Sequence, residues 1–169
     1  MIVIIGFIKL FKKNKIVSVE NPIIGIATEN EPLVIAPLTK PYSNNAYRFS
    51  LNLPEDFIVI EKKSDTGDVL IFNNDKGQGI QIIISPFDNI TRFDESIVRA
   101  SLPDLSISDV QTLNVGKDNT GIAFASDNQA FGGASREVWF VFNSRLYQIT
   151  TYKNLDPLLK TVFGTWKFF

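Results

Sequence analysis

Residues 134–166, ASREVWFVFNSRLYQITTYKNLDPLLKTVFGTW, decide the fold. In residues 136–142 the apolar side chains of Val138, Phe140 and Phe142 fall on one face, because successive side chains of a strand point to opposite faces. Residues 146–152 are also rich in aromatic and β-branched side chains, and the polar tripeptide at residues 143–145 between the two runs favours a turn. The stretch therefore predicts an antiparallel hairpin.

A helix is expected directly after the hairpin. Asp156 offers an N-cap acceptor, and Pro157 has its φ angle fixed for the first helical position. The apolar residues that follow form one stripe on a helical surface, namely Leu158, Leu159, Val162, Phe163 and Trp166. We expect this stripe to pack on the sheet. The nearby aromatic residues are accordingly interpreted as core rather than as a ligand pocket or a platform for nucleobases.

Upstream of this stretch the chain reads as a series of short strands with one further helix. Alternating or apolar runs predict strands at residues 47–53, 57–60, 69–72, 79–85, 107–115 and 121–126. The Asn-rich segment 73–77 predicts a hairpin turn rather than a calcium loop, because Ile84 stands where such a loop needs a bidentate Glu. Thr91 and Asp94 resemble a capping box, which predicts a helix over residues 92–101. The fold class is α+β.

Composition excludes several kinds of chemistry. The chain of 169 residues has no cysteine and no histidine, which rules out disulfides, thiol nucleophiles, zinc-thiolate sites and His-based catalytic triads. Its formal charge is −1, but residues 1–15 carry four lysines and no acid, so the remaining 13 basic and 18 acidic residues leave −5. This balance does not favour nucleic-acid binding.

The N-terminal third divides into two segments ahead of the domain. Residues 1–15 combine an apolar run with a lysine-rich end, and residues 16–45 contain four prolines, which favour an extended linker. The apolar run is too short to cross a bilayer, which needs roughly 20 residues. Three readings stay open: a truncated membrane anchor, an interfacial segment, or a strand or helix docked on the domain. The domain itself is expected at residues 46–169.

Three acidic residues form the best candidate for catalysis. Glu61, Asp65 and Asp68 lie in a charged turn, where carboxylates can hold a hard cation or act as acid and base. Asp65-Thr66-Gly67 also matches the aspartic-protease triplet, but that chemistry needs a second carboxylate in a dry cleft, and no second triplet exists. A solvated surface turn is the preferred interpretation. The sequence thus assigns no catalytic, cofactor-binding or metal-ligating residue.

Several segments resemble the PsbP-like superfamily, which includes PsbP, Mog and DcrB-type proteins. The resemblance covers about residues 46–169 and rests on YRFSLNLPEDF, LPDL, GIAFAS, REVWFVF, LYQITTY and LLKTVFGTWKF. It implies a central antiparallel sheet of about six or seven strands sandwiched by helices (α/β/α), in bacterial members often anchored at a membrane. The family's metal-linked histidine is missing here, so no manganese role is implied.

The resemblance implies a non-enzymatic binding or assembly domain, tethered at a membrane through residues 1–15 and without a cofactor. The expected partner is a protein or a small apolar ligand, not nucleic acid. Extracytoplasmic placement follows from the resemblance, whereas Lys12–Lys15 would by the positive-inside rule lie in the cytoplasm. Two alternatives stay open: a carrier of an apolar ligand between sheet and helix, and a small metal-assisted hydrolase that uses Glu61, Asp65 and Asp68.

Overall fold

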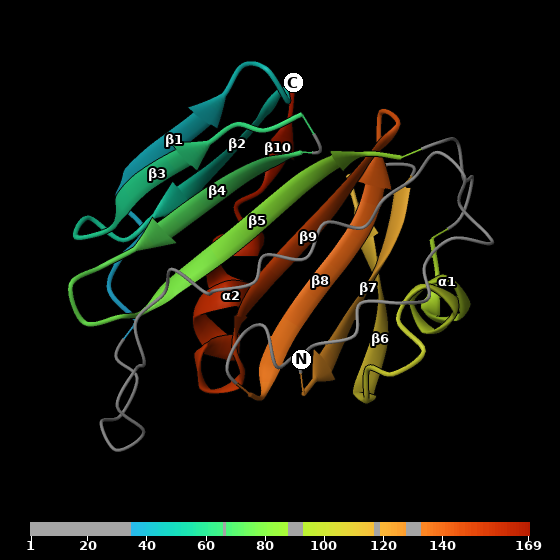
Figure 1. Cartoon of the computed structure of the whole chain (residues 1–169). Helices are drawn as coiled ribbons and strands as arrows, with labels where there is room; N and C mark the ends of the chain where they lie inside the picture. Colours follow the sequence, from blue (N-terminus) through green and yellow to red (C-terminus); the bar gives the residue numbers. More distant parts are fainter. Residues whose placement is uncertain (1–34, 66, 88–92, 117–118, 128–132) are drawn as a thin grey trace.

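The structure, a computed structural model, describes residues 35–65, 67–87, 93–116, 119–127 and 133–169. These residues form a seven-stranded and a three-stranded antiparallel sheet with two α-helices (Figure 1). The strands are β1 (Lys40–Asn44), β2 (Phe49–Leu53), β3 (Ile58–Lys62), β4 (Asp68–Asn73), β5 (Gly79–Pro86), β6 (Ile107–Val115), β7 (Asn119–Ser126), β8 (Ser135–Phe142), β9 (Arg145–Tyr152) and β10 (Lys167–Phe168). The helices are α1 (Glu95–Ser101) and α2 (Asp156–Phe163), and a 3-10 turn spans Lys153–Leu155.

The seven-stranded sheet has the order β3-β4-β5-β9-β8-β7-β6, and all its pairs are antiparallel. The predicted β8–β9 hairpin is confirmed. Its turn residues Asn143 and Ser144 both have positive φ angles, 49° and 55°, as a type I′ turn requires. The predicted β4–β5 hairpin is also confirmed, and Asn74 Oδ1 accepts hydrogen bonds from the backbone of Lys76 and Gln78 within its turn.

The two faces of the seven-stranded sheet are covered differently. The face that we call the inner face packs against α2 and the three-stranded sheet, and its core includes Leu70, Ile82, Ile149 and Phe140. The opposite face, which we call the distal face, carries α1 at its β6–β8 end. There a second core cluster is formed by Phe87, Phe93, Val98, Ile107, Ile122, Phe124, Trp139 and Leu146.

The three-stranded sheet joins distant parts of the chain. Its order is β1-β2-β10, and in β10 Lys167 pairs with Ser50 and Phe168 pairs with Phe49. β1 lies within the stretch that the sequence assigns to the linker, so the packed domain includes residues upstream of Asn45. Pro41 fits an edge strand, where its missing N–H costs no ladder hydrogen bond.

Both helices begin at different residues than the sequence predicts. The N-cap of α1 is Asp94, whose side chain accepts from the Ser96 amide, so Asp94 is not the third helical residue of a capping box; Thr91 and Arg92 lie outside the described residues. The N-cap of α2 is Leu155. The Asp156 amide donates to the Lys153 carbonyl of the preceding 3-10 turn, so Asp156 is already helical. Asp156 was therefore wrongly predicted as a cap. Its carboxylate instead pairs with Arg136 and Lys160.

The expected α+β class and central antiparallel sheet are confirmed. The expected sandwich of helices holds only in part. On the inner face a single helix shares the layer with the three-stranded sheet, and among the described residues α1 is the one helix on the distal face. The reason is that β2 pairs with β1 and β10 and so builds a second small sheet instead of extending the first.

Candidate functional site

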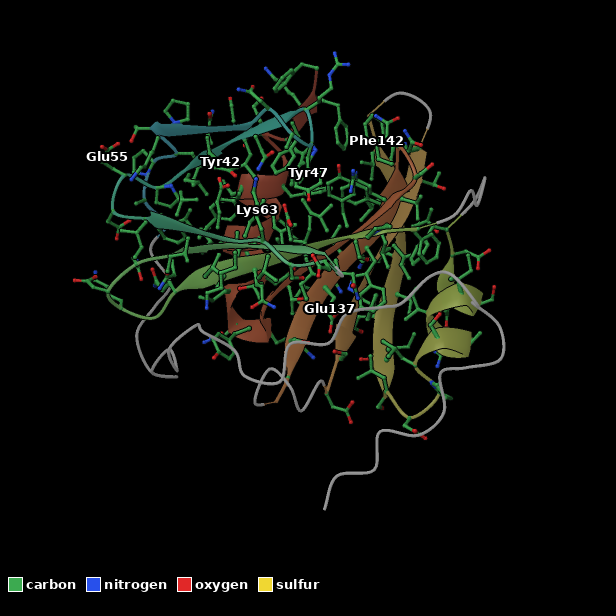
Figure 2. All side chains as sticks on the ribbon, turned by 45° about the horizontal axis from the view of Figure 1, so that its top comes forward. Tyr42, Tyr47, Glu55, Lys63, Glu137 and Phe142 are labelled. Carbon is green, nitrogen blue, oxygen red and sulfur yellow. The ribbon has the colours of Figure 1, made fainter. Side chains whose placement is uncertain are left out.

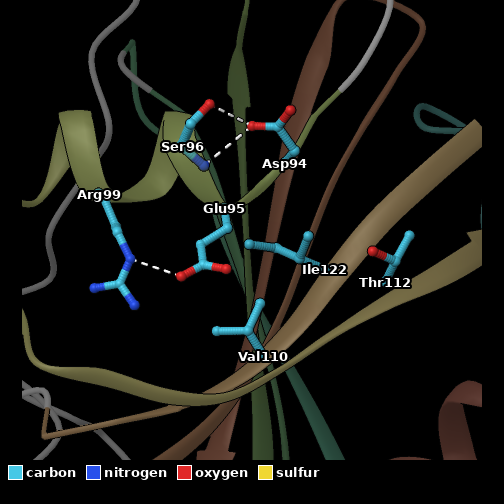
Figure 3. A pocket seen from close by; sticks show the side chains of 7 residues that line it. All are labelled: Asp94, Glu95, Ser96, Arg99, Val110, Thr112 and Ile122. Atoms are coloured by element: carbon cyan, nitrogen blue, oxygen red, sulfur yellow. Dashed lines mark hydrogen bonds and ion pairs between the residues drawn. The ribbon is translucent and has the colours of Figure 1, made fainter.

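An open concavity in the described part of the chain lies between α1 and the edge of the seven-stranded sheet. It has a volume of about 500 Å³ and is lined by Asp94, Glu95, Ser96, Arg99, Val110, Thr112 and Ile122. Figure 3 shows the first two turns of α1 on one side and the side chains from β6 and β7 on the other. We call this concavity the α1–β6 groove.

The groove has a charged wall and an apolar wall. On the helix side the Arg99 guanidinium and the Glu95 carboxylate form an exposed ion pair at 2.7 Å (Figure 3). On the strand side Val110 and Ile122 supply apolar surface. An ion pair at the rim of an apolar surface can orient a peptide or small molecule of mixed polarity, but it supplies no activated nucleophile. The groove therefore presents a charged and an apolar wall side by side.

The structure does not gather the three candidate carboxylates, Glu61, Asp65 and Asp68, into a site. The Tyr42 hydroxyl donates to Glu61 Oε1 at 2.7 Å, Asp68 takes part in a hydrogen bond with Tyr47, and Asp65 is exposed in the turn between β3 and β4. Figure 2 shows Tyr42 and Tyr47 in the layer between the two sheets. In the described ranges no three acidic residues come close enough to hold a metal ion together. Glu61 and Asp68 thus act as links between the sheets.

Several tyrosines of this layer hold their protons more firmly than usual. Burial raises the pKa of Tyr147 to about 12, and the nearby Arg145 guanidinium opposes part of that rise. Burial, followed by the hydrogen bond to Glu61, raises the pKa of Tyr42, and burial together with Asp68 raises the pKa of Tyr47. Each hydroxyl is therefore neutral throughout the physiological range.

These pKa shifts predict a loss of stability at high pH. In the unfolded chain a tyrosine loses its proton near pH 10, whereas folded Tyr147 keeps it up to about pH 12. The contribution of Tyr147 to the free energy of unfolding is fully present below pH 10 and is lost as the pH rises to 12. Between pH 9 and 11.5 the free energy of unfolding of Tyr147→Phe, measured by urea denaturation, should fall by about 2 kcal/mol less than that of the unaltered protein. Identical pH profiles for the two proteins would contradict this assignment.

The space between the sheet and α2 is nearly filled by side chains. It holds a cavity of about 10 Å³ lined by apolar residues that include Leu51, Ile82, Leu159 and Trp166. That volume suits at most one water molecule, whereas drug-sized ligands occupy several hundred Å³. The aromatic side chains here are mutually packed, as expected: Phe140 stacks on Tyr147 at 4.8 Å between ring centroids, and Trp166 stacks on Phe49 at 4.1 Å.

The α1–β6 groove was not predicted from the sequence. Its residues come from α1, β6 and β7, and no local pattern places this short helix beside the β6 edge. The one available signal was the polar composition of residues 107–115, ISDVQTLNV, whose side chains are mostly exposed or half-buried in the structure. An amphipathic edge strand is compatible with a partner surface, but also with plain solvent exposure.

A comparison with solved protein structures supports the fold. No protein-family model matches the chain, and no curated protein sequence matches it. Among solved structures, the chain is similar to the solution structure of cyanobacterial PsbP (CyanoP) from Synechocystis sp. PCC 6803, with a TM-score of 0.52 and 10% sequence identity. The match covers 77% of this chain and 92% of that one. The protein therefore has a PsbP-like fold.

Proposed function

We propose that this protein is a non-enzymatic accessory domain that binds a protein partner through the α1–β6 groove. The observation that carries the proposal is the groove itself, an open concavity of about 500 Å³ with an exposed ion pair on one wall and apolar surface on the other. The likeness to cyanobacterial PsbP adds support, because the PsbP-like resemblance implies accessory and assembly roles. Carboxylates engaged as links between sheets do not favour a hydrolase, and an interior with only about 10 Å³ of free space does not favour a lipid carrier.

Site-specific photocross-linking tests the groove. A benzoylphenylalanine at Thr112, which is exposed and lines the groove, is expected to form an adduct of one defined mass in the cells that make the protein. Val110→Asp, which places a charge on the apolar wall, should reduce the yield of that adduct at least tenfold, because the charge is costly to bury against a partner. Mass spectrometry of the adduct then identifies the partner.

The matched control uses Ile58, which is 55% exposed on β3 at the opposite edge of the sheet. The same cross-linker at Ile58, and the substitution Ile58→Asp, should leave the adduct pattern unchanged. Equal adducts from Thr112 and Ile58, or an adduct from Thr112 that survives Val110→Asp, would refute the groove as the binding surface.

We further propose that residues 1–15 tether this domain to a membrane. The support is their composition, an apolar run followed by Lys12, Lys13 and Lys15. Their structure lies outside the described residues. Within the residues that the structure does describe, no helix is both long enough and apolar enough to cross a bilayer. We place the domain on the extracytoplasmic side, with a cytoplasmic position as the alternative that the order of charges favours.

A vesicle-binding measurement checks the tether. Changing Lys9, Lys12, Lys13 and Lys15 to Gln in the full chain should weaken binding to anionic vesicles by roughly 100- to 1,000-fold, because each lysine near such a surface contributes about 1 kcal/mol. The matched control changes four exposed lysines of the domain to Gln: Lys62, Lys63, Lys76 and Lys167. Both variants lose the same charge. Equal losses of binding would show that net charge, not the N-terminal segment, governs the association.

A further inference from the structure

β6 is the outermost strand of the seven-stranded sheet in the order that the described residues form. An edge strand points every second pair of N–H and C=O groups away from its neighbour in the sheet, where a further strand can bind them. Along this edge Gln111, Thr112 and Asn114 are exposed. β6 thus offers backbone hydrogen-bonding groups as well as side chains to a partner.

A bulge limits the part of the edge that a regular strand can use. The register with β7 shifts between Ser108 and Gln111, and Asp109 has a positive φ angle of 52°. Arg136 Nη1 donates to the Asp109 carbonyl at 3.2 Å, which holds the bulge against β8. From Gln111 to Val115 the pairing with β7 is continuous, so these residues form the regular part of the edge.

The regular part of the edge runs beside the α1–β6 groove. Thr112 pairs with Ile122 of β7, and both residues line the groove. Leu113 points to the other face of the sheet and packs on the inner-face core. An added strand would lie about 4.8 Å beyond β6. Its alternate side chains would then continue the row formed by Thr112 and Ile122 and enter the groove, while the side chains between them face the other side.

The helix side of the groove favours a positively charged partner. Its charged residues are Asp94, Glu95 and Arg99, two acids and one base, which gives a formal charge of −1. Asp94 Oδ1 accepts from the Ser96 amide at 3.0 Å. Figure 3 shows the Glu95 carboxylate between α1 and the strand side of the groove, near Val110. A cation of the partner is therefore best placed beside Glu95, next to apolar side chains that contact Val110.

We propose that the partner adds an extended segment to the β6 edge as a further strand, with apolar and basic side chains that alternate with others and enter the groove. This inference rests on the proposed function and names the form of the partner that the groove binds. Backbone hydrogen bonds to residues 111–115 supply affinity, and alternate side chains supply specificity, as in other cases of strand addition. A helix or a folded surface would fill the groove without using these backbone groups.

N-methylated peptides test strand addition without altering the protein. The probe is an end-capped hexapeptide in which threonine alternates with valine, lysine and valine, so that valine and lysine share one face. In an extended peptide the threonine amides point to one edge and the remaining amides to the opposite edge. We expect N-methylation of one set to weaken binding at least tenfold, and of the other set by less than about twofold, in NMR titrations. The unmodified peptide should slow hydrogen exchange at alternate amides of residues 111–115.

Reversing a charge tests the basic side chain. Replacing the lysine of the peptide with glutamate should weaken binding about fivefold, and Glu95→Lys should reverse this preference, because an exposed ion pair is exchanged for a repulsion. The matched control is Glu55→Lys, which makes the same change of charge at an exposed residue outside the groove (Figure 2). It should leave the preference for lysine unchanged.

The remaining outcomes overturn the proposal. Equal effects of the two methylated sets would mean that the peptide does not bind as a strand. Equal affinity for the lysine and glutamate peptides would contradict a basic partner. Absence of binding would refute strand addition, whereas the groove itself is judged separately by the Thr112 adduct and its dependence on Val110. An adduct that persists without peptide binding would assign the groove to a folded surface of the partner.

Discussion

Replacing Phe140 with alanine is expected to lower the free energy of unfolding by about 3 to 5 kcal/mol, the range for removing a fully buried aromatic side chain. Phe140 is 0% exposed and lies at the centre of the aromatic cluster that joins β8 and β9 to α2 and β10. Its ring stacks on Tyr147 and also meets Phe163, Trp166 and Phe168 edge-on or tilted. Alanine would leave a cavity between the sheet and the C-terminal elements.

Urea denaturation followed by tryptophan fluorescence measures this loss, because Trp166 lies 5.8 Å from Phe140 between ring centroids. The matched control is Phe169→Ala, since Phe169 is 52% exposed and its removal should change stability by no more than about 0.5 kcal/mol. A loss below 1 kcal/mol for Phe140→Ala would mean that the cluster is not the main contact between the layers.

Replacing Arg136 with alanine is expected to lower the free energy of unfolding by about 2 to 3 kcal/mol. The side chain is only 7% exposed and extends from β8 to Asp156 at the start of α2, at 3.2 Å. It also donates to the Asp109 carbonyl and to Gln111 Oε1 in β6. Breaking a buried ion pair costs up to about 5 kcal/mol. The lower range applies here because Asp156 is 25% exposed and keeps Lys160 as a partner.

Arg99→Ala is the matched control, because Arg99 also pairs with a carboxylate but is 53% exposed. Exposed ion pairs contribute about 0 to 1 kcal/mol, so thermal and urea unfolding should separate the two arginines clearly. Equal effects would show that Arg136 contributes only surface charge, and the link between β6 and α2 would then need another explanation.

Local patterns predicted the elements whose signals lie within a few residues. The β8–β9 hairpin follows from alternating apolar residues and from Asn143-Ser144, and its two turn residues adopt the positive φ angles that such a turn demands. The stripe of α2 was likewise predictable, and Leu158, Leu159 and Val162 are buried as expected. These features depend on backbone sterics and on periodic burial, which a sequence displays directly.

Pairings between distant residues were not predictable from local patterns. β1 lies in a proline-bearing stretch, and it forms a strand because β2 and the C-terminal β10 complete a sheet around it. The starts of both helices were also missed. Asp94 caps α1 through a local hydrogen bond from the Ser96 amide, whereas Asp156 forms a tertiary ion pair with Arg136 of β8. The groove is missed for the same reason, because it exists only where α1 meets the edge of the sheet.

The pairing of β10 with β2 has a consequence for synthesis. Residues 167–168 must hydrogen bond with residues 49–50, and the Phe169 amide donates to the carbonyl of Arg48 at 3.0 Å. A nascent chain therefore cannot close its smaller sheet while these residues are still inside the ribosomal exit tunnel. Until these residues emerge, Phe49 is not covered by the ring of Trp166 that stacks on it in the folded domain. The growing polypeptide then exposes apolar surface that favours binding by chaperones.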